Sequence, residues 1–289
     1  MIAFTIFGWP IYWYGIMYLI SFLIWYAYLR FISRTSLFAN YPRLQSLLKD
    51  QLDDVMFAIM LGVLLGGRLG DVVLYNRSYY SQHLIQILYI WNGWMSFVGG
   101  LIGVATAIRI IKYIKKLTYA DIFVLFDAIV FILPLAILLG RIGNGLNQEL
   151  YGKMISFSTI KERWVSIETL YKFHIIRIYN LIDNQYRRNT NLLEGFFEGF
   201  MLFVIQSVRF GVYFIKGGVI GYYPWLVTGR FCIVYGMLRF FLEILRDNPH
   251  SEYIWWVLKS QLLMVLMIFL WVWILLVMRQ YSSKLDKAK

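Results

Sequence analysis

Long apolar runs dominate this sequence and constrain its fold more than any other feature. A helix that crosses a bilayer needs roughly 20 mainly apolar residues, and unpaired backbone groups are costly in lipid. Such stretches are therefore predicted to be membrane helices. The predicted spans cover residues 11–29, 54–75, 84–108, 119–139, 192–214, 218–244 and 254–278. The predicted fold class is all-α, a polytopic membrane protein with seven transmembrane helices and a small extracytoplasmic cap.

The composition agrees with this class. Of the 289 residues, 60% are hydrophobic and 15% are charged, whereas a soluble domain is about half apolar and about a quarter charged. The 11 Trp and 22 Tyr residues suit two aromatic belts at the membrane interfaces. The formal charge of +12 comes from residues in the connections between apolar runs rather than from one continuous face. This pattern predicts the membrane as a partner and excludes nucleic acid.

Basic residues gather on alternate connections, and their bias sets the predicted orientation. The opposite side carries few of them, with Arg77 and Arg246 in its short connections. We therefore expect the N-terminus outside and the C-terminus in the cytoplasm. Residues 140–191 then form an extracytoplasmic loop and cap inserted into a single integral membrane domain, 1–289. The basic residues of the cytoplasmic side are Arg30, Arg34, Arg43, Lys49, Arg109, Lys112, Lys115, Lys116, Arg209, Lys216, Arg279, Lys284, Lys287 and Lys289.

Cysteine and histidine give no sign of a metal site. Cys232 is the one cysteine, and it lies in an apolar run, so it is predicted to be a packed thiol. His83, His174 and His250 are scattered without metal-ligand spacing. We therefore expect no metal.

A polar, glycine-rich stretch follows directly on the fourth apolar run. It reads Gly140-Arg-Ile-Gly-Asn-Gly-Leu-Asn-Gln-Glu-Leu-Tyr-Gly152, and Ile122–Leu139 before it carries Asp127 as its one charge. Glycines allow tight turns and close approach of the backbone to a ligand. Polar groups at the edge of a bilayer usually serve a site. Arg141, Asn144 and Glu149 are therefore predicted to form a binding site, although a polar turn that caps a helix would look similar.

Two further features in the second and third apolar runs also invite a functional interpretation. Arg68 and Asp71 lie three residues apart, on one helix face, where they can form a structural ion pair or contact a substrate. Residues 91–100 interrupt the third run, and Gly99, Gly100 and Gly103 there favour either close helix packing or the approach of a ligand.

The sixth apolar run contains a functional stripe. Tyr235, Arg239 and Glu243 are spaced by four residues and share one helix face. A carboxylate one turn from an arginine holds its guanidinium, which can then present its remaining donors to a phosphate. Arg239 and Arg141 could thus converge on one anion.

The fifth apolar run adds Glu194 and Glu198, again four apart. They either neutralise the arginines or assist proton transfer. The residues by themselves therefore predict an anion site in a helical membrane protein. A phospholipid head group and a small transported anion both fit that description.

The order of these motifs resembles one bacterial family, the phosphatidylglycerol–prolipoprotein diacylglyceryl transferases. The Gly140–Gly152 stretch is its most specific signature. The resemblance covers most of the chain and is carried by Trp13–Tyr18, Gly66–Gly70 with Tyr75 and Asn76, Met95–Gly103, Gly140–Asn144, Asn147–Gly152, Tyr235–Arg239, Glu243 and Arg246.

This resemblance implies a reaction and a site. The family transfers the diacylglyceryl group of phosphatidylglycerol to the lipobox cysteine thiol of a preprolipoprotein, in the bacterial plasma membrane and without a cofactor. By resemblance, Arg141 binds phosphatidylglycerol, and Asn144, Glu149 and Gly152 are the other signature positions. Tyr235, Arg239 and Glu243 match the functional stripe.

The chain departs from the family pattern at two places. Val98 stands where the family motif has a histidine that is a candidate base. Residues 188–194 read Arg-Asn-Thr-Asn-Leu-Leu-Glu, where the family has His-Pro-Ser/Thr-Gln-Leu-Tyr-Glu. The leading hypothesis is an active transferase with an altered proton path. The alternative is a catalytically impaired relative that binds phospholipid or prolipoprotein without turnover.

Overall fold

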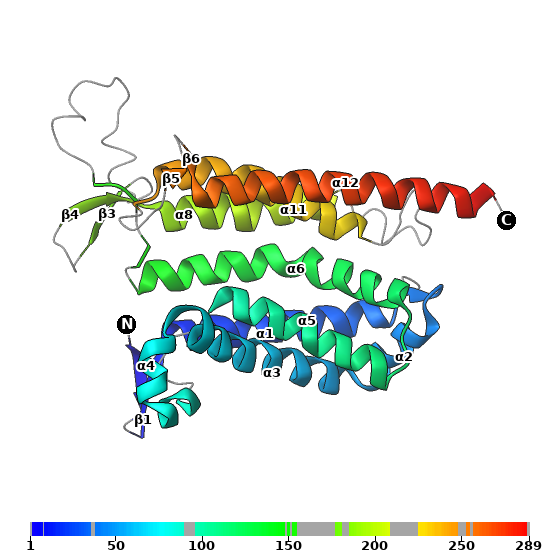
Figure 1. Ribbon diagram of the computed structural model, residues 1–289, viewed down its shortest axis with the longest axis horizontal. Helices are drawn as coiled ribbons and strands as arrows, with labels where there is room; N and C mark the ends of the chain where they lie inside the picture. The colour runs from blue at the N-terminus through cyan, green and yellow to red at the C-terminus, as the bar shows by residue number, and fades with distance from the viewer. Residues whose placement is uncertain are drawn as a thin grey trace. The chain divides into compact units, whose positions relative to one another are not determined.

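Helices make up most of the fold in a computed structural model of the chain (Figure 1). The structure describes residues 2–7, 9–35, 38–89, 96–147, 149–150, 152–154, 177–180, 185–208, 225–247, 253–254 and 257–287. The chain divides into two compact units, one of residues 1–25 and 126–289 and the other of residues 26–125.

Four helices in the described residues are long and apolar enough to cross a membrane. They are Gly15–Ser33, Leu52–Val73, Tyr119–Leu146 and Ser260–Arg279. These correspond to the predicted first, second, fourth and seventh spans, so the membrane class is confirmed. The other predicted spans are helical only in part within the described residues, and the complete set of seven stays a prediction, as does the cap.

The N-terminal span is preceded by a strand pair that the sequence analysis missed. Strands β1 (Ile2–Ile6) and β2 (Trp9–Tyr12) form an antiparallel hairpin, and helix α1 (Trp13–Ser33) follows directly. A two-residue strand pair, β5 (Tyr253–Ile254) with β6 (Val257–Leu258), likewise precedes the last helix, α12 (Lys259–Lys287).

The third predicted span begins later than expected. Residues Leu84–Leu88 form a 3-10 turn, η3, and helix α5 runs over Phe97–Ile114. Ser96 caps α5, because its Oγ accepts a hydrogen bond from the backbone N–H of Gly99 at 3.0 Å. Two described elements, η3 and α5, thus lie where one long helix was predicted.

Helices α3 (Leu52–Gly70) and α5 form the centre of the 26–125 unit, and glycines bring their backbones together. A Cβ on Gly66 would lie 2.7 Å from the Cα of Gly103, and one on Gly70 would lie 2.6 Å from the Cα of Gly99. Small residues on facing stripes permit such close approach in membrane helices. Gly99 and Gly103 thus serve helix packing, whereas a Cβ on Gly100 would meet no atom closer than 3.8 Å.

Helix α6 (Tyr119–Leu146) is longer than predicted and corrects the expected loop boundary. It continues beyond Leu139 through the first half of the glycine-rich stretch, so Arg141 and Asn144 lie in helical turns rather than in a loop. Glycine only weakens a helix, and packing against a neighbouring element can compensate for that cost. The polar stretch leaves the helix only after Leu146.

Three more helical segments complete the unit of residues 1–25 and 126–289. Helix α8 (Thr190–Glu194) continues through a π-helical segment, η6 (Gly195–Met201), into α9 (Leu202–Gln206). Helix α11 (Leu226–Leu242) lies beside α12 (Figure 1), and Gly229 and Gly236 face α12 side chains. Val130 of α6, Leu202 of α9 and Phe231 of α11 share one buried cluster, which holds these elements together.

Asp127 fixes the start of α11 to α6. Its Oδ1 accepts hydrogen bonds from the backbone N–H of Thr228 at 2.8 Å and from the Thr228 hydroxyl at 2.7 Å. The first N–H groups of a helix have no partner within the helix, and a carboxylate there also favours the helix dipole. The one charge of Ile122–Leu139 therefore caps a neighbouring helix.

Candidate functional site

A π-helical segment and two glycines set the distance between α6 and η6. A Cβ on Gly195 would lie 3.3 Å from Arg141 Cβ, and a Cβ on Gly199 would lie 2.7 Å from Leu138 Cβ. Only a residue without a side chain tolerates this proximity at Gly199. Short π-helical segments occur frequently at functional sites. In this protein, the π-helical segment η6 and its two glycines bring Arg141 within reach of the carboxylates on α8 and η6.

Arg141 pairs with both glutamates of the fifth apolar run. Its Nη1 lies 2.9 Å from Oε2 of Glu194, and its Nη2 donates to Oε2 of Glu198 at 3.2 Å. Both glutamate side chains have no exposed surface, whereas 14% of the Arg141 side chain is exposed. The neutralising role considered for Glu194 and Glu198 is thus what their geometry shows.

Arg239 approaches the same two carboxylates from α11. Its Nη1 lies 3.0 Å from Oε1 of Glu194 and donates to Oε1 of Glu198 at 3.4 Å. Its Nη2 lies 2.6 Å from Oε2 of Glu243, one helical turn away, as the spacing predicts. Ser260, at the start of α12, donates its hydroxyl to the other Glu243 oxygen at 3.2 Å. Arg239 is therefore held by three carboxylates, and Ser260 of α12 holds one of them in turn.

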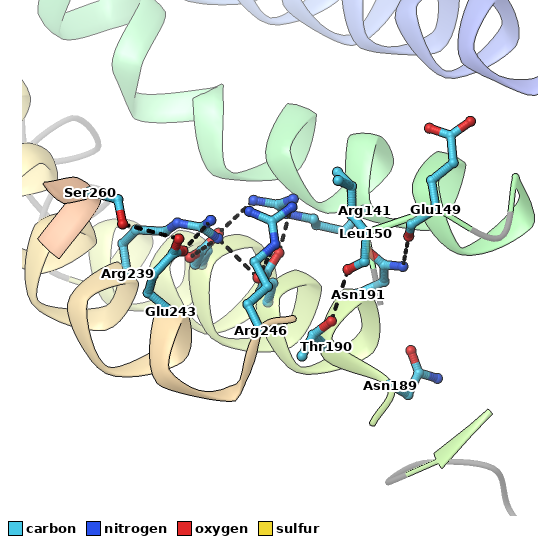
Figure 2. Close-up of polar contacts among 12 residues, drawn as sticks. Arg141, Glu149, Leu150, Asn189, Thr190, Asn191, Arg239, Glu243, Arg246 and Ser260 are labelled. Atoms are coloured by element: carbon cyan, nitrogen blue, oxygen red, sulfur yellow. Dashed lines mark hydrogen bonds and ion pairs between the residues drawn. The ribbon is translucent and has the colours of Figure 1, made fainter. Parts of the chain in front are cut away.

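Arg246 is the third guanidinium of the cluster, at 3.7 Å from Oε1 of Glu194 (Figure 2). Burial lowers the pKa of Arg246 from its ordinary value, and the nearby Glu194 acts against that shift. A guanidinium nevertheless stays charged at neutral pH. In the described part of the chain the ion pairs thus join three arginines, Arg141, Arg239 and Arg246, to three glutamates, Glu194, Glu198 and Glu243, with a formal charge of zero.

The two central glutamates are held differently. The buried oxygens of Glu194 lie within ion-pair distance of arginines, but these contacts lack hydrogen-bond geometry. Each oxygen of Glu198 accepts a hydrogen bond, one from Arg141 and one from Arg239. Among the described contacts, Glu198 is thus bridged by Arg141 and Arg239, whereas Glu194 also has Arg246.

The second half of the glycine-rich stretch positions α8 rather than presenting Glu149 to the cluster. The Glu149 side chain is exposed and points away from the arginines in Figure 2, while its carbonyl accepts a hydrogen bond from Asn191 Nδ2 at 2.7 Å. Thr190 donates to the carbonyl of Leu150 at 3.0 Å, and Leu150 has a positive φ of 57°. Asn144 is buried with 5% of its surface exposed.

Gly152 lies at a crossing of three chain segments. Its N–H donates to the carbonyl of Arg188 at 2.9 Å, and it pairs with Arg246 in an antiparallel bridge. A Cβ here would lie 2.7 Å from the Leu245 carbonyl oxygen and 2.8 Å from Arg188 Cβ. Glycine is therefore required at this position for packing beside the cluster. The adjoining hairpin of β3 (Arg177–Asn180) and β4 (Gln185–Arg188) ends at the same crossing.

Tyr235 lies one turn before Arg239, on the side of the buried apolar cluster. Its ring stacks on Phe231 with 5.4 Å between the centroids and 11° between the planes. It is also close enough to Glu198 and Arg239 for an electrostatic interaction. The predicted stripe of Tyr235, Arg239 and Glu243 is thus one continuous face that reaches the ion-pair cluster.

Arg68 and Asp71 belong to the 26–125 unit, where their described contacts are structural. Arg68 Nε donates to the carbonyl of Ile87 at 3.0 Å, its Nη2 donates to the carbonyl of Gln86, and its guanidinium lies 5.1 Å from the Tyr80 ring centroid. Asp71 accepts hydrogen bonds from Asn76 at 2.9 Å and Tyr80 at 3.1 Å. Each charge therefore secures the 76–88 connection, and the substrate role of Arg68 stays a prediction.

Comparison with known proteins decides the family. The sequence model of the prolipoprotein diacylglyceryl transferase family matches residues 1–277. The chain belongs to this family. It is therefore a transferase of lipoprotein biosynthesis, as the resemblance predicts, and nothing favours the impaired alternative.

Individual relatives agree along most of the chain. A phosphatidylglycerol–prolipoprotein diacylglyceryl transferase of Buchnera aphidicola is 34% identical over 248 residues, which cover 81% of this chain and 79% of the relative. Enzymes of the same name from Wolbachia pipientis and Beijerinckia indica are 34% and 31% identical and cover 90% and 96% of this chain, and 88% and 93% of their own lengths.

The two departures from the family pattern fall in different places. Val98 is in the first turn of α5, but its side chain lies outside the described residues. Of the altered stretch 188–194, Thr190 and Asn191 anchor α8 by the hydrogen bonds described above, and Glu194 keeps its place between the arginines. Sequence reasoning missed Thr190, Asn191 and Ser260, because short polar side chains beside a helix end look like ordinary caps.

Proposed function

We propose that this transferase binds the phosphate of phosphatidylglycerol at Arg141 and Arg239. The diacylglyceryl group then passes to the lipobox cysteine thiol of a preprolipoprotein. The observation that carries the proposal is the convergence of the two guanidiniums, from α6 and α11, on one pair of buried carboxylates. The family assignment supplies the reaction class.

A phosphate can replace these carboxylates because both anions take a guanidinium through paired hydrogen bonds. The side chains of Arg141 and Arg239 are 14% and 11% exposed, so neither is fully enclosed by the protein. Without a ligand, Glu194 and Glu198 offset the cost of burying two positive charges. With a ligand, the phosphate takes over part of that role.

The reaction then has a clear electrostatic demand. The thiol sulfur attacks the glyceryl carbon, a thioether bond forms, and the carbon–oxygen bond to the phosphate breaks. Negative charge grows on the departing glycerol phosphate. Guanidiniums that already bind the phosphate before the reaction need no reorganisation as that charge grows, which is the arrangement that lowers a barrier most.

The other signature residues have supporting roles in this proposal. Tyr235 extends the Arg239 face toward the apolar core, and Asn144 lies one turn after Arg141 on α6. Gly152 and Glu149 shape the surrounding backbone. With the N-terminus outside, as the basic residues predict, the cluster lies at the outer leaflet of the bacterial inner membrane, where preprolipoproteins emerge.

Incubation of the purified protein with phosphatidylglycerol liposomes and a lipobox peptide tests the proposal. We expect release of glycerol phosphate and a peptide whose mass increases by the diacylglyceryl group. Arg187→Ala is the matched control for Arg239→Ala, because Arg187 also pairs with a carboxylate, Asp247 at 2.5 Å, but outside the cluster. Loss of transfer in both variants, or in neither, would contradict the assignment. Lipid that copurifies without any turnover would support the impaired alternative.

A further inference from the structure

We infer that Glu198 is the proton acceptor for the attacking thiol. Phosphatidylglycerol makes Glu198 a stronger base, because its phosphate binds the two arginines that otherwise pair with this carboxylate. The inference rests on the proposed function of the cluster. It addresses a gap that the sequence leaves open, because Val98 cannot accept a proton where the family motif has a histidine. It also gives a chemical role to a glutamate whose described contacts are those of a counter-ion.

The pairing of Glu198 separates it from its neighbour. Both Glu198 oxygens are bound by the two proposed phosphate ligands, by Arg141 at 3.2 Å and by Arg239 at 3.4 Å. Glu194 is closer to the same arginines, at 2.9 and 3.0 Å, and keeps Arg246 at 3.7 Å in addition. Among the described residues, a phosphate that binds both shared arginines therefore leaves Glu198 without a cation but leaves Glu194 with Arg246.

A carboxylate that loses its cations in a buried site becomes a stronger base, because the protein no longer stabilises its charged form. Glu198 has no exposed surface, so water does not replace the lost guanidiniums. The groups that face it are Arg141 from α6, Arg239 and Tyr235 from α11, and Glu194 from α8. With the arginines engaged by phosphate, the remaining negative neighbour, Glu194, further favours protonation of Glu198.

Charge and protons are conserved through the proposed reaction. Three guanidiniums and three carboxylates are neutral before substrate binds, and the lipid phosphate adds one negative charge. Transfer of the thiol proton to Glu198 neutralises that carboxylate as the sulfur–carbon bond forms and the carbon–oxygen bond breaks. The departing phosphate then carries two negative charges, and Glu198 returns its proton to that phosphate or to water when the product leaves.

A change of nucleophile separates a proton acceptor from a residue that only holds the arginines. A lipobox peptide with selenocysteine in place of cysteine carries a selenol that is already ionised at neutral pH and needs no base. Glu198→Gln keeps the size of the side chain but cannot accept the proton. We expect it to lower kcat for the cysteine peptide by about a hundredfold or more, the usual contribution of a general base, and to leave kcat for the selenocysteine peptide within a few-fold of wild type.

The pH dependence gives a second readout. In Glu198→Gln the rate with the cysteine peptide should rise about tenfold per pH unit until the thiol ionises by itself near pH ~8.5. Glu194→Gln is the matched control, since it removes the same charge from the same two arginines. Any loss that comes from the arginines should be the same few-fold factor with both peptides, and the wild-type pH profile should be kept.

The possible results of these experiments distinguish a proton acceptor from a residue that only positions the arginines. Equal loss with both peptides in Glu198→Gln would show that the residue only positions the arginines and would overturn the inference, as would an unchanged rate with the cysteine peptide. If Glu198→Gln fails to fold, Glu198→Asp serves instead, with an intermediate rate expected for cysteine and a normal rate for selenocysteine. A wild-type protein that modifies neither peptide would overturn the proposed function itself, and this inference with it.

Discussion

Two regions of the protein place arginine in an apolar helix, and they satisfy its charge in different ways. Arg68 donates to the backbone carbonyls of Gln86 and Ile87, which are fixed parts of the fold. Arg141 and Arg239 instead share the carboxylates of Glu194 and Glu198. A backbone carbonyl cannot leave without local unfolding, whereas a side-chain carboxylate can be replaced by another anion. The partner of a buried arginine thus distinguishes a structural charge from one available to a ligand.

The largest effect is expected at Arg141. Arg141→Ala should lower the rate of diacylglyceryl transfer by about a hundredfold to a thousandfold, because the leaving phosphate loses a fixed pair of hydrogen-bond donors. Arg141→Lys should be nearly as damaging, since an ammonium cannot bind phosphate in a bidentate manner. Release of glycerol phosphate from liposomes measures both. Wild-type activity in the lysine variant would show that a point charge is enough and that Arg141 needs no bidentate contact with phosphate.

Arg68 should show the opposite profile. Arg68→Gln is expected to lower the free energy of unfolding by roughly 1–3 kcal/mol, the cost of leaving buried carbonyls without their charged donor, with little change in KM for phosphatidylglycerol. Unfolding in detergent micelles and steady-state kinetics measure the two quantities. A large rise in KM at unchanged stability would mean that Arg68 contacts the lipid, so that both regions serve the substrate.

The ion pair between Arg239 and Glu243 should have a smaller effect, measured as a coupling free energy between the two residues. Glu243→Ala frees the guanidinium to reorient, and Arg239→Ala leaves a carboxylate buried without that partner. A double-mutant cycle on the free energy of unfolding should give a coupling of about 1 kcal/mol or more. The same cycle on Arg68 with Glu243 serves as the control and should be additive within experimental error. Additivity in the first cycle would show that Arg239 and Glu243 act independently.

The smallest effect is expected at Val98. Val98→Ala should cost little activity if the thiol proton goes to Glu198, since a valine takes no part in proton transfer. Val98→His should be tolerated beside Gly99 and should raise the rate near neutral pH, where an imidazole titrates. Transfer rates between pH 6 and 9 measure both variants. A crippled but well-folded Val98→Ala enzyme would contradict the proton path through the arginine cluster.

Local sequence patterns predicted the positions of several helices and one of the ion pairs. The apolar runs predicted helices at residues 54–75 and 119–139, and the structure has helices there. The i, i+4 spacing predicted the contact between Arg239 and Glu243, which is an ion pair of 2.6 Å. Helix formation and neighbouring contacts on one helix depend on residues close in sequence, so a single sequence contains the information.

The tertiary structure decided which of the marked residues meet. The sequence grouped Arg141 with Glu149, but α6 continues to Leu146, and the exposed Glu149 side chain points away from the cluster while Glu194 and Glu198 reach it. Likewise, nothing local indicated that Gly195 and Gly199 would set the helix distance that allows those contacts.

The sequence by itself thus determined the membrane class, the main helices, the family and the residue types of the site. Only the tertiary structure decided that Arg141, Arg239 and Arg246 meet the same carboxylates. The physical reason is the separation along the sequence of the residues that interact. Hydrophobic length and helical period act over a few turns of one segment, whereas an ion pair between α6 and α8 requires the packing of two helices far apart in sequence. The same packing makes Glu198 a bridge between two arginines, which no spacing rule contains.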